Sequence, residues 1–197
     1  MKTILYIHGF NSTGTGMKSE AIRSHYRNCR VLTPTFNYKD FPATLKLLNN
    51  TIMTGKVDVV VGTSLGGFLA LYGASKFKKK CLVINPTLEP SQTLLRFVGE
   101  NRNFVTKERY ILTEADLKPY AEFEKKEFSK VLSGKQPLAD ADTRILLSED
   151  DELLGNHHDL ESKIPSCHHF QYFPGMNHQF TATRPIFEAI DELIELI

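Results

Sequence analysis

Short hydrophobic runs of strand length recur along the chain and alternate with longer stretches of mixed polarity. The runs are rich in Val, Ile and Leu and lack polar alternation, a pattern typical of strands that are covered on both faces of a parallel sheet. They comprise residues Thr3–Ile7, Cys29–Pro34, Val57–Val61, Lys80–Asn85, Arg144–Ser148 and His169–Phe173. The pattern therefore predicts a mostly parallel sheet of about six strands.

Helical patterns separate most of these runs. The C-terminal stretch carries apolar residues at spacings of three and four, which is the signature of an amphipathic helix. Helices are expected at Met17–Arg27, Phe41–Met53, Leu65–Phe77 and Arg184–Ile197. Alternating strands and helices imply βαβ units with right-handed crossovers. We therefore predict an α/β fold of three layers, a compact parallel sheet flanked by helices, and a single domain over residues 1–197.

A long segment, Leu88–Pro137, interrupts this rhythm. It is dense in charge between Lys118 and Lys130, and part of it is compatible with a helix that has one apolar face. The residues of that face would be Tyr120, Phe123, Phe128, Val131 and Leu132. Insertions of this size between strands often have a function. The segment at about 88–137 is expected to be a lid over a site or a set of extra helices covering the sheet, and the sequence favours neither.

The composition excludes several classes of partner. Lys and Arg total 24 against 23 Asp and Glu, so the net charge of +1 gives no reason to expect nucleic acid or an anionic membrane as a partner. No apolar segment approaches the roughly 20 residues that span a bilayer. The three cysteines lack CxxC spacing, and no secretory signal pattern precedes the first strand. We therefore expect a cytoplasmic protein.

The clearest chemical motif is Gly62-Thr63-Ser64-Leu65-Gly66, a G-x-S-x-G pattern. It follows an apolar strand and opens a helix, the context of a nucleophile elbow, in which a tight turn projects a serine above the sheet. A structural turn with a capping serine is the alternative interpretation. The strand before the motif and the helix after it favour Ser64 as a nucleophile.

A serine nucleophile needs a base and a group that orients the base. In folds that carry a nucleophile elbow, the three residues follow the chain order serine, acid, histidine. An acidic cluster follows the strand at 144–148, and His178 lies in a loop after the strand at 169–173. Adjacent residues of an extended segment point to opposite sides, so one of Asp150 and Asp151 is expected to face His178. We favour Asp151 as the acid, with the other acidic residues on a solvated loop face.

An oxyanion hole is expected from two backbone N–H groups. One belongs to Leu65, the residue after the nucleophile, and the other to Phe10, in the loop after the first strand. Asn11 is expected to donate to the site or to hold this loop in shape, and His8 is expected to shape the loop by hydrogen bonding. The glycines of this loop match no nucleotide-binding pattern, so no cofactor is predicted. The adjacent pairs 157–158 and 168–169 lack the spacing of a zinc helix, so no metal site is predicted.

Six segments together resemble the small bacterial YqiA-type esterases, a compact branch of the α/β-hydrolase superfamily. The segments are LYIHGFNS, VVVGTSLGGFLA, VINPTLEP, GENRN, DDELL and GMNH, and they span nearly the whole chain in the family's order. The resemblance implies hydrolysis of carboxylic esters without a cofactor, with Ser64, Asp151 and His178 as catalytic residues. One departure is that Glu149 and Asp150 precede the acid where small or neutral residues are more usual.

The same residues would also serve a thioesterase or an acyltransferase, and the sequence does not separate these activities. A hydrolase-like binding protein without turnover is a further alternative, although such proteins usually lose one of the three catalytic residues. The expected partner is a small-molecule ester. Whether the chain forms a homo-oligomer is left open by the sequence.

Overall fold

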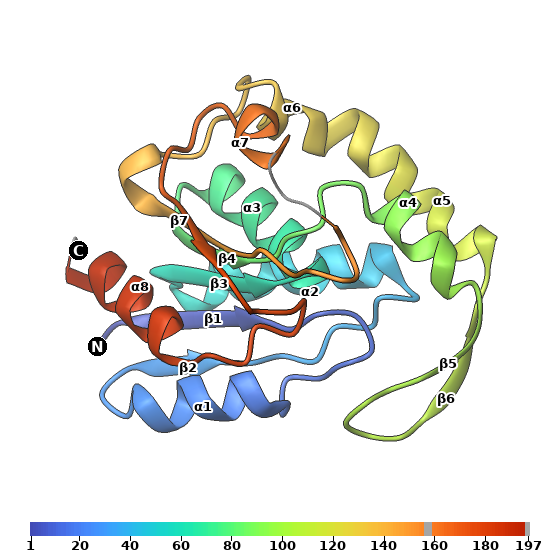
Figure 1. The fold of residues 1–197 in the computed structure, drawn as a ribbon, viewed down its shortest axis with the longest axis horizontal. Helices are drawn as coiled ribbons and strands as arrows, with labels where there is room; N and C mark the ends of the chain where they lie inside the picture. Colours follow the sequence, from blue (N-terminus) through green and yellow to red (C-terminus); the bar gives the residue numbers. More distant parts are fainter. Residues whose placement is uncertain (156–158, 196–197) are drawn as a thin grey trace.

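The computed structural model describes residues 1–155 and 159–195. Within them, six strands form one parallel sheet in the order β2-β1-β3-β4-β7-β8 (Figure 1). Their bounds are β1 Thr3–Ile7, β2 Arg30–Leu32, β3 Val59–Thr63, β4 Lys80–Ile84, β7 Thr143–Ser148 and β8 Phe170–Phe173. The order reverses direction beside β1, which is the arrangement of a doubly wound sheet.

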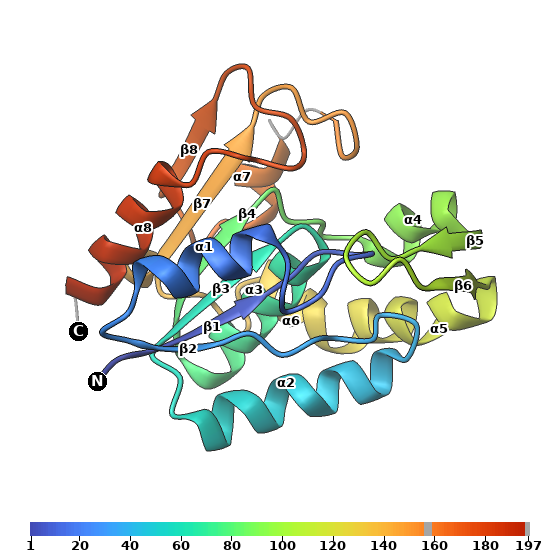
Figure 2. The ribbon, with the colours of Figure 1, turned by 90° about the horizontal axis from the view of Figure 1, so that it is seen from below.

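Helices cover both faces of this sheet (Figure 2). One face packs against α1 and α8, and the other against α2, α3 and the helices α5 and α6. The bounds are α1 Met17–His25, α2 Phe41–Gly55, α3 Leu65–Phe77, α4 Pro90–Thr93, α5 Glu114–Phe123, α6 Ser129–Leu132, α7 Leu160–Lys163 and α8 Arg184–Glu195. The predicted three-layer α/β fold is therefore confirmed.

The third strand begins and ends two residues later than the hydrophobic run predicts. The Asp58 carboxylate accepts the backbone N–H of Thr3 at 2.7 Å, and the Asp58 N–H donates to Thr3 O at 2.9 Å, so this residue already pairs with β1 before the ladder begins. The ladder with β1 then starts at Val59 opposite Ile4. At the other end of the chain α8 is amphipathic as predicted, and Ile197 lies outside the described residues.

The insertion between β4 and β7 has two halves of different character. Its helical half, Glu114–Leu132, runs through α5, a π-helical turn and α6. Tyr120 stacks on Phe41 of α2 at 4.0 Å between ring centroids, and Phe128 lies 4.3 Å from Phe68 of α3. The predicted apolar face is therefore packed against the helices that cover the sheet.

The other half of the insertion is an antiparallel hairpin, β5 Gly99–Arg102 and β6 Arg109–Leu112, which the sequence did not predict. Its strands are four residues long and largely polar or exposed, as at Ile111, which is 58% exposed. In the sequence, β5 is polar and the apolar run of β6 is only three residues long, Tyr110–Leu112, so the signal for strands was weak. Figure 1 shows the hairpin extending from one end of the sheet.

Truncation of Phe128 tests the attachment of the helical half. The side chain is 1% exposed, so Phe128→Ala is expected to lower the free energy of unfolding by about 3–5 kcal/mol. Urea denaturation measures this change. Ile111→Ala removes an exposed apolar side chain of the same insertion and is expected to change stability by less than about 0.5 kcal/mol. Equal effects of the two substitutions would contradict this packing.

Candidate active site

Ser64 occupies the junction of β3 and α3 in a strained backbone conformation. Its φ of 55° and ψ of −119° lie in a region that residues with a side chain rarely adopt, at a cost of about 1–3 kcal/mol. Its N–H still donates to Ile84 O of β4 at 2.9 Å, while its own carbonyl accepts from Gly67 at 2.8 Å. Ser64 thus belongs to both the sheet and the helix, and its side chain lies at the carboxyl edge of the sheet.

The glycines of the motif are required by close contacts between backbone segments. A Cβ atom on Gly62 would lie 2.2 Å from Gly66 O, and one on Gly66 would lie 2.2 Å from Ile7 O of β1. A Cβ atom on Gly67 would lie 2.8 Å from Pro86 Cβ. No side chain fits at such distances. The predicted strand–turn–helix context of the motif is confirmed, with β1, β3 and α3 meeting around Ser64.

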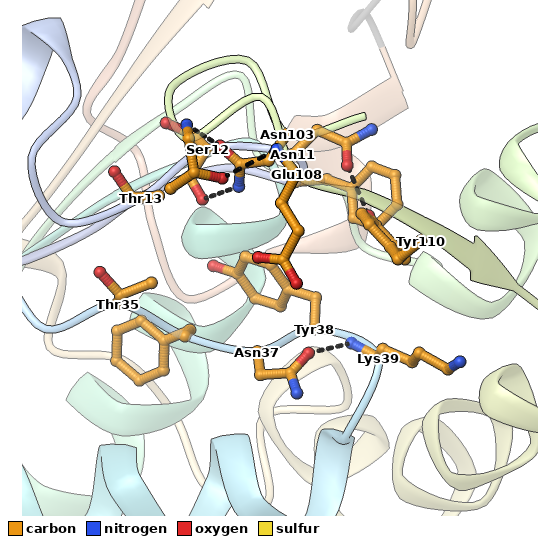
Figure 3. Close-up of a pocket in the computed structure, with 13 residues that line it drawn as sticks. Asn11, Ser12, Thr13, Thr35, Asn37, Tyr38, Lys39, Asn103, Glu108 and Tyr110 are labelled. Carbon is orange, nitrogen blue, oxygen red and sulfur yellow. Dashed lines mark hydrogen bonds between the residues drawn. The ribbon is translucent and has the colours of Figure 1, made fainter. Parts of the chain in front are cut away.

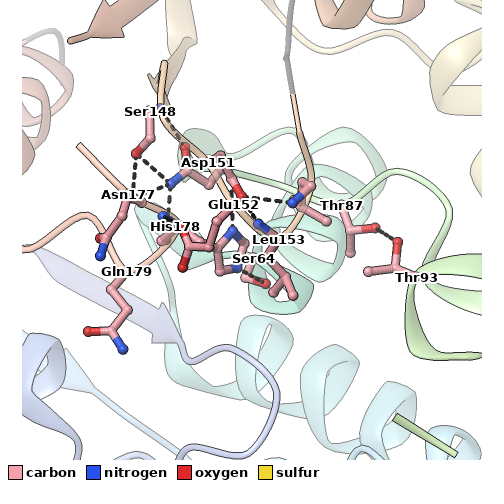
Figure 4. Close-up of polar contacts among 12 residues, drawn as sticks. Ser64, Thr87, Thr93, Ser148, Asp151, Glu152, Leu153, Asn177, His178 and Gln179 are labelled. Carbon is pink, nitrogen blue, oxygen red and sulfur yellow. Dashed lines mark hydrogen bonds and ion pairs between the residues drawn. The ribbon is translucent and has the colours of Figure 1, made fainter. Parts of the chain in front are cut away.

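The three residues expected to form a triad come together at this edge (Figure 4). His178 Nε2 lies 2.9 Å from Ser64 Oγ, and His178 Nδ1 lies 2.8 Å from Asp151 Oδ2. The Asp151 side chain is fully buried, and the His178 side chain is 12% exposed. Ser64 follows β3, Asp151 follows β7 and His178 follows β8, so the carboxyl ends of three parallel strands supply them.

The two adjacent aspartates have different partners. Asp151 Oδ1 accepts the backbone N–H groups of Leu153 and Leu154 at 2.9 and 2.8 Å, which leaves Oδ2 directed at the imidazole. Asp150 Oδ2 instead accepts the N–H of Gly175 at 2.9 Å. Of the two, Asp151 is therefore the residue in contact with His178.

Glu152 has a contact that the sequence did not predict. Its side chain is exposed, as expected of the acidic loop, but Oε2 accepts the backbone N–H of His178 at 2.9 Å. This hydrogen bond lowers the pKa of the Glu152 carboxyl below its usual value. Glu152 therefore connects the loop after β7 to the residue that carries the imidazole.

Asn85 is a buried residue of the site that the sequence analysis missed. It follows β4 with a φ of 44° and is fully buried. Its Nδ2 donates to Ser148 Oγ at 2.8 Å and to His178 O at 3.0 Å, and Ser148 Oγ donates to Asn177 O at 2.7 Å. The loop that carries His178 is thus tied to β4 and β7. The sequence signal that could have indicated Asn85 is a polar residue at the end of an apolar strand.

The predicted oxyanion donors, Phe10 and Leu65, line the same cavity as Ser64. Leu65 is the first residue of α3, a position at which the backbone N–H has no partner within the helix. The loop after β1 passes directly beside the serine, since a Cβ atom on Gly9 would lie 3.3 Å from Ser64 Cβ. Both N–H groups therefore belong to backbone segments adjacent to Ser64.

The hairpin of the insertion holds this loop in place. Phe104 N–H donates to Asn11 O at 2.7 Å, and Asn11 Nδ2 donates to Asn101 Oδ1 at 3.2 Å. The Phe10 ring packs at 5.2 Å from the Phe97 ring. Of the two expectations for Asn11, the structure shows the side chain holding the loop in shape.

His8 stabilises the start of the same loop as a neutral imidazole. Its Nε2 accepts the backbone N–H of Phe36 at 2.9 Å, so the ring proton is on Nδ1, which donates to Gly9 O at 2.8 Å. Burial lowers the pKa of His8 to about 4. The expected role of His8, shaping the loop through hydrogen bonds, matches these contacts.

A cavity of about 510 Å³ opens beside Ser64 and His178. Its apolar wall comes from the elbow, the segment around α4, the hairpin and the loop after β7. The residues of this wall are Leu65, Leu94, Phe97, Phe104, Val105 and Leu153. Such a largely apolar space with a few polar groups is typical of a small-molecule site.

A second cavity of about 410 Å³ shares Phe10, Asn11 and Ser12 with the lining of the first (Figure 3). It is more polar, with Lys39 and Glu108 among its lining residues. Neither Ser64 nor His178 is among the described residues that line it. Several of its polar groups are used within the protein, as when Asn103 Nδ2 donates to Ser12 O at 3.0 Å.

The remaining histidine pairs lie away from this site or are not described. His168 and His169 approach Asp140, with nitrogen–oxygen distances of 3.3 and 3.9 Å. His157 and His158 lie outside the described residues. In the described part of the chain, no three His, Cys, Asp or Glu side chains are grouped so as to hold a metal ion.

The buried His8 predicts a specific pH dependence of stability. Because the folded state lowers its pKa from 6.5 to about 4, the unfolded chain takes up a proton in this window that the folded protein does not. The free energy of unfolding is therefore expected to fall by about 3 kcal/mol between pH 6.5 and 4 through this residue. Urea denaturation across this range is expected to give a shallower loss for His8→Gln. The control is His25→Gln, and an unchanged slope in His8→Gln would contradict the assignment.

Solved structures with the same fold include proteins of low sequence identity. Est1E from Butyrivibrio proteoclasticus matches with a TM-score of 0.67 and 14% identity, over 99% of this chain and 87% of that one. MGS-MChE2, described as an alpha/beta hydrolase enzyme from a sediment metagenome, gives 0.62 and 14%, over 98% and 90%. The esterase domain of a Rhodothermus marinus protein gives 0.60 and 17%, over 98% and 84%. These likenesses show that the chain has the α/β-hydrolase fold.

The described residues contain no helix of the length and hydrophobicity needed to cross a membrane.

A family model described as "Uncharacterised protein family (UPF0227)" matches residues 3–195, nearly the whole chain. The chain therefore belongs to the UPF0227 family of α/β-hydrolase-fold proteins.

Proposed function

We propose that this protein is a serine hydrolase that cleaves carboxylic esters through an acyl-enzyme intermediate. The observation that carries the proposal is the chain of two short contacts from Ser64 Oγ through His178 to Asp151, at 2.9 and 2.8 Å. Two proteins of similar structure support the reaction class: the esterase domain of a Rhodothermus marinus protein, and Est1E, of which a structure with bound ferulic acid is also known.

In the first step, Ser64 Oγ attacks the ester carbonyl carbon while His178 Nε2 accepts the hydroxyl proton. The tetrahedral oxyanion is stabilised by the N–H groups of Leu65 and Phe10, which act where charge develops in the transition state. When the intermediate collapses, the carbon–oxygen bond to the alcohol breaks and His178 protonates the leaving alkoxide. The product of this step is a Ser64 ester.

In the second step, His178 takes a proton from a water molecule, which attacks the acyl-enzyme carbonyl. Collapse of the second tetrahedral intermediate returns the proton to Ser64 Oγ and releases the carboxylic acid. Asp151 holds Nδ1–H of the imidazole throughout, so that Nε2 is free to accept a proton, and it stabilises the charged imidazolium. Glu152 and Asn85 act as positioning residues, because each bonds to the backbone of His178.

We further propose that the chain is a single domain in which the insertion at 88–137 has two roles. The helical half completes the layer of α2 and α3, as supported by the Tyr120 ring stacked on Phe41 of α2 and by Tyr120 Oη donating at 2.7 Å to Tyr38 O, just before α2. The hairpin half is the cover of the cavity, supported by Phe104 and Val105 in the cavity wall. On this proposal, a movable lid would be confined to the hairpin.

Hydrolysis of 4-nitrophenyl esters of increasing acyl length tests the proposed function. Ser64→Ala and His178→Ala are each expected to lower kcat by about 10⁴-fold or more, because the triad acts as a unit. Asp151→Asn is expected to cost about 10²- to 10⁴-fold by losing the imidazole's orientation. A fluorophosphonate probe is expected to label the wild type and not Ser64→Ala.

Ser24→Ala is the matched control, since Ser24 is an exposed serine on α1. It is expected to keep both the turnover and the labelling. Turnover that persists in Ser64→Ala, with folding verified by circular dichroism, would overturn the proposal. Labelling of Ser64 without hydrolysis of any oxygen ester would point instead to thioesters, which the same residues can cleave.

A further inference from the structure

The Phe10 N–H, one of the two donors in the proposed mechanism, belongs to a loop without regular structure. Residues 8–12 follow β1 and form neither helix nor strand. Among the described residues, none accepts a hydrogen bond from this N–H. A donor contributes to catalysis when the protein fixes it in advance at the place where charge develops. The contacts that fix the backbone on either side of Phe10 therefore bear on turnover.

Tyr38 fixes the loop on the side before Phe10. Its Oη donates to the backbone carbonyl of His8, two residues earlier in the chain than Phe10. The rings of Tyr38 and His8 meet edge to face, with 5.3 Å between their centroids. Tyr38 is buried, and its own carbonyl accepts from Tyr120 Oη of α5 at 2.7 Å. This anchor is thus itself held by the helical half of the insertion.

Tyr110, in β6, fixes the loop on the side after Phe10. Its Oη donates to Oδ1 of Asn11, the next residue in the chain. Its ring also meets the Phe10 ring edge to face, at 6.4 Å between centroids. Asn11 is buried and has a φ of 57°, a left-handed conformation that asparagine adopts more readily than most residues. Tyr110 therefore holds the residue at which the backbone of the loop turns.

The two tyrosines reach the loop from outside the active-site cavity. Both line the second cavity (Figure 3), and neither is among the described residues that line the cavity at Ser64. Burial raises the pKa of Tyr110 to about 12 and raises that of Tyr38 well above its usual value. Each phenol therefore keeps its proton at neutral pH and acts as a donor to the loop, not as an acid or base in the reaction.

We infer that Tyr38 and Tyr110 are positioning residues of the oxyanion hole, which hold the backbone before and after Phe10 so that its N–H meets the oxyanion formed at Ser64. This inference rests on the proposed ester hydrolysis. Loss of either hydroxyl releases one end of the loop. The N–H then stabilises the transition state less well, while the apolar cavity binds the substrate as before.

Substitutions that remove one hydroxyl and keep the ring test this inference. Tyr38→Phe and Tyr110→Phe are each expected to lower kcat for 4-nitrophenyl butanoate about ten- to a hundredfold, since a misplacement of about 1 Å costs up to about a hundredfold. KM is expected to change by less than about twofold, because the affected hydrogen bond is made in the transition state. Unchanged kcat in the two folded variants would overturn the inference.

Tyr26→Phe is the matched control. Tyr26 is buried between α1 and α8, and its Oη donates to Phe187 O at 2.9 Å. The substitution therefore also takes a phenol donor from a backbone carbonyl, but away from the oxyanion loop, and is expected to keep kcat. An equal loss of kcat in this control would overturn the inference. Should Tyr38→Phe fail to fold, as judged by circular dichroism, the half-buried Tyr110 carries the same test.

An inhibitor that resembles the transition state separates positioning from a general structural role. Butyl trifluoromethyl ketone is expected to add to Ser64 as a hemiketal, whose oxygen lies where the oxyanion forms. Its Ki is expected to rise in each tyrosine variant by the factor by which kcat/KM falls, and to stay unchanged in Tyr26→Phe. A fall in kcat/KM without weaker inhibition would overturn the inference.

Amide hydrogen exchange follows the loop without turnover. Exchange in a peptide covering residues 8–12 is expected to be faster in Tyr38→Phe and Tyr110→Phe than in the wild type, and unchanged in Tyr26→Phe. If Ser64→Ala keeps turnover, the proposed function fails and this inference fails with it. If Ser64→Ala loses turnover while the tyrosine variants keep the wild-type kcat and loop exchange, only this inference fails.

Discussion

The close approach of three backbone segments around Ser64 is the constraint on which the rest of the site depends. β1, β3 and α3 meet so tightly that Gly62 and Gly66 admit no Cβ atom. The strained conformation of Ser64 persists because the sheet holds its N–H while α3 holds its carbonyl. The result is a serine at the carboxyl edge of the sheet, followed by Leu65, whose N–H has no partner within the helix that it begins.

The parallel sheet brings other loops to the turn at Ser64 and so forms a site. All carboxyl ends of its strands lie at one edge, so the loops after β3, β7 and β8 meet there without special arrangement. Their exact approach depends on buried polar contacts. Asn85 joins β4 to Ser148 and to the backbone carbonyl of His178, and Glu152 accepts the backbone N–H of the same residue. The backbone of the residue that carries the imidazole is thereby held by the segments that follow β4 and β7.

The insertion contributes to stability and to the cavity through different parts. The helical half buries Tyr120 and Phe128 against α2 and α3, so it belongs to the layer that covers the sheet. The hairpin half has little buried surface and contacts the loop after β1 through Asn101 and Phe104. Local stability follows the density of buried contacts. The hairpin is thus a part of the cavity wall with few contacts to the core.

The sequence by itself determined the layers, the strand order along the chain, and the identity of Ser64 and His178 as residues at strand ends. Local hydrophobic periodicity and the glycines of the elbow encode these features. The tertiary structure decided that Asp151 rather than Asp150 contacts His178, and that Asn85 is a buried polar link. Ser64 and His178 are 114 residues apart in the chain, and contacts across such separations depend on how whole elements pack, which no local pattern records.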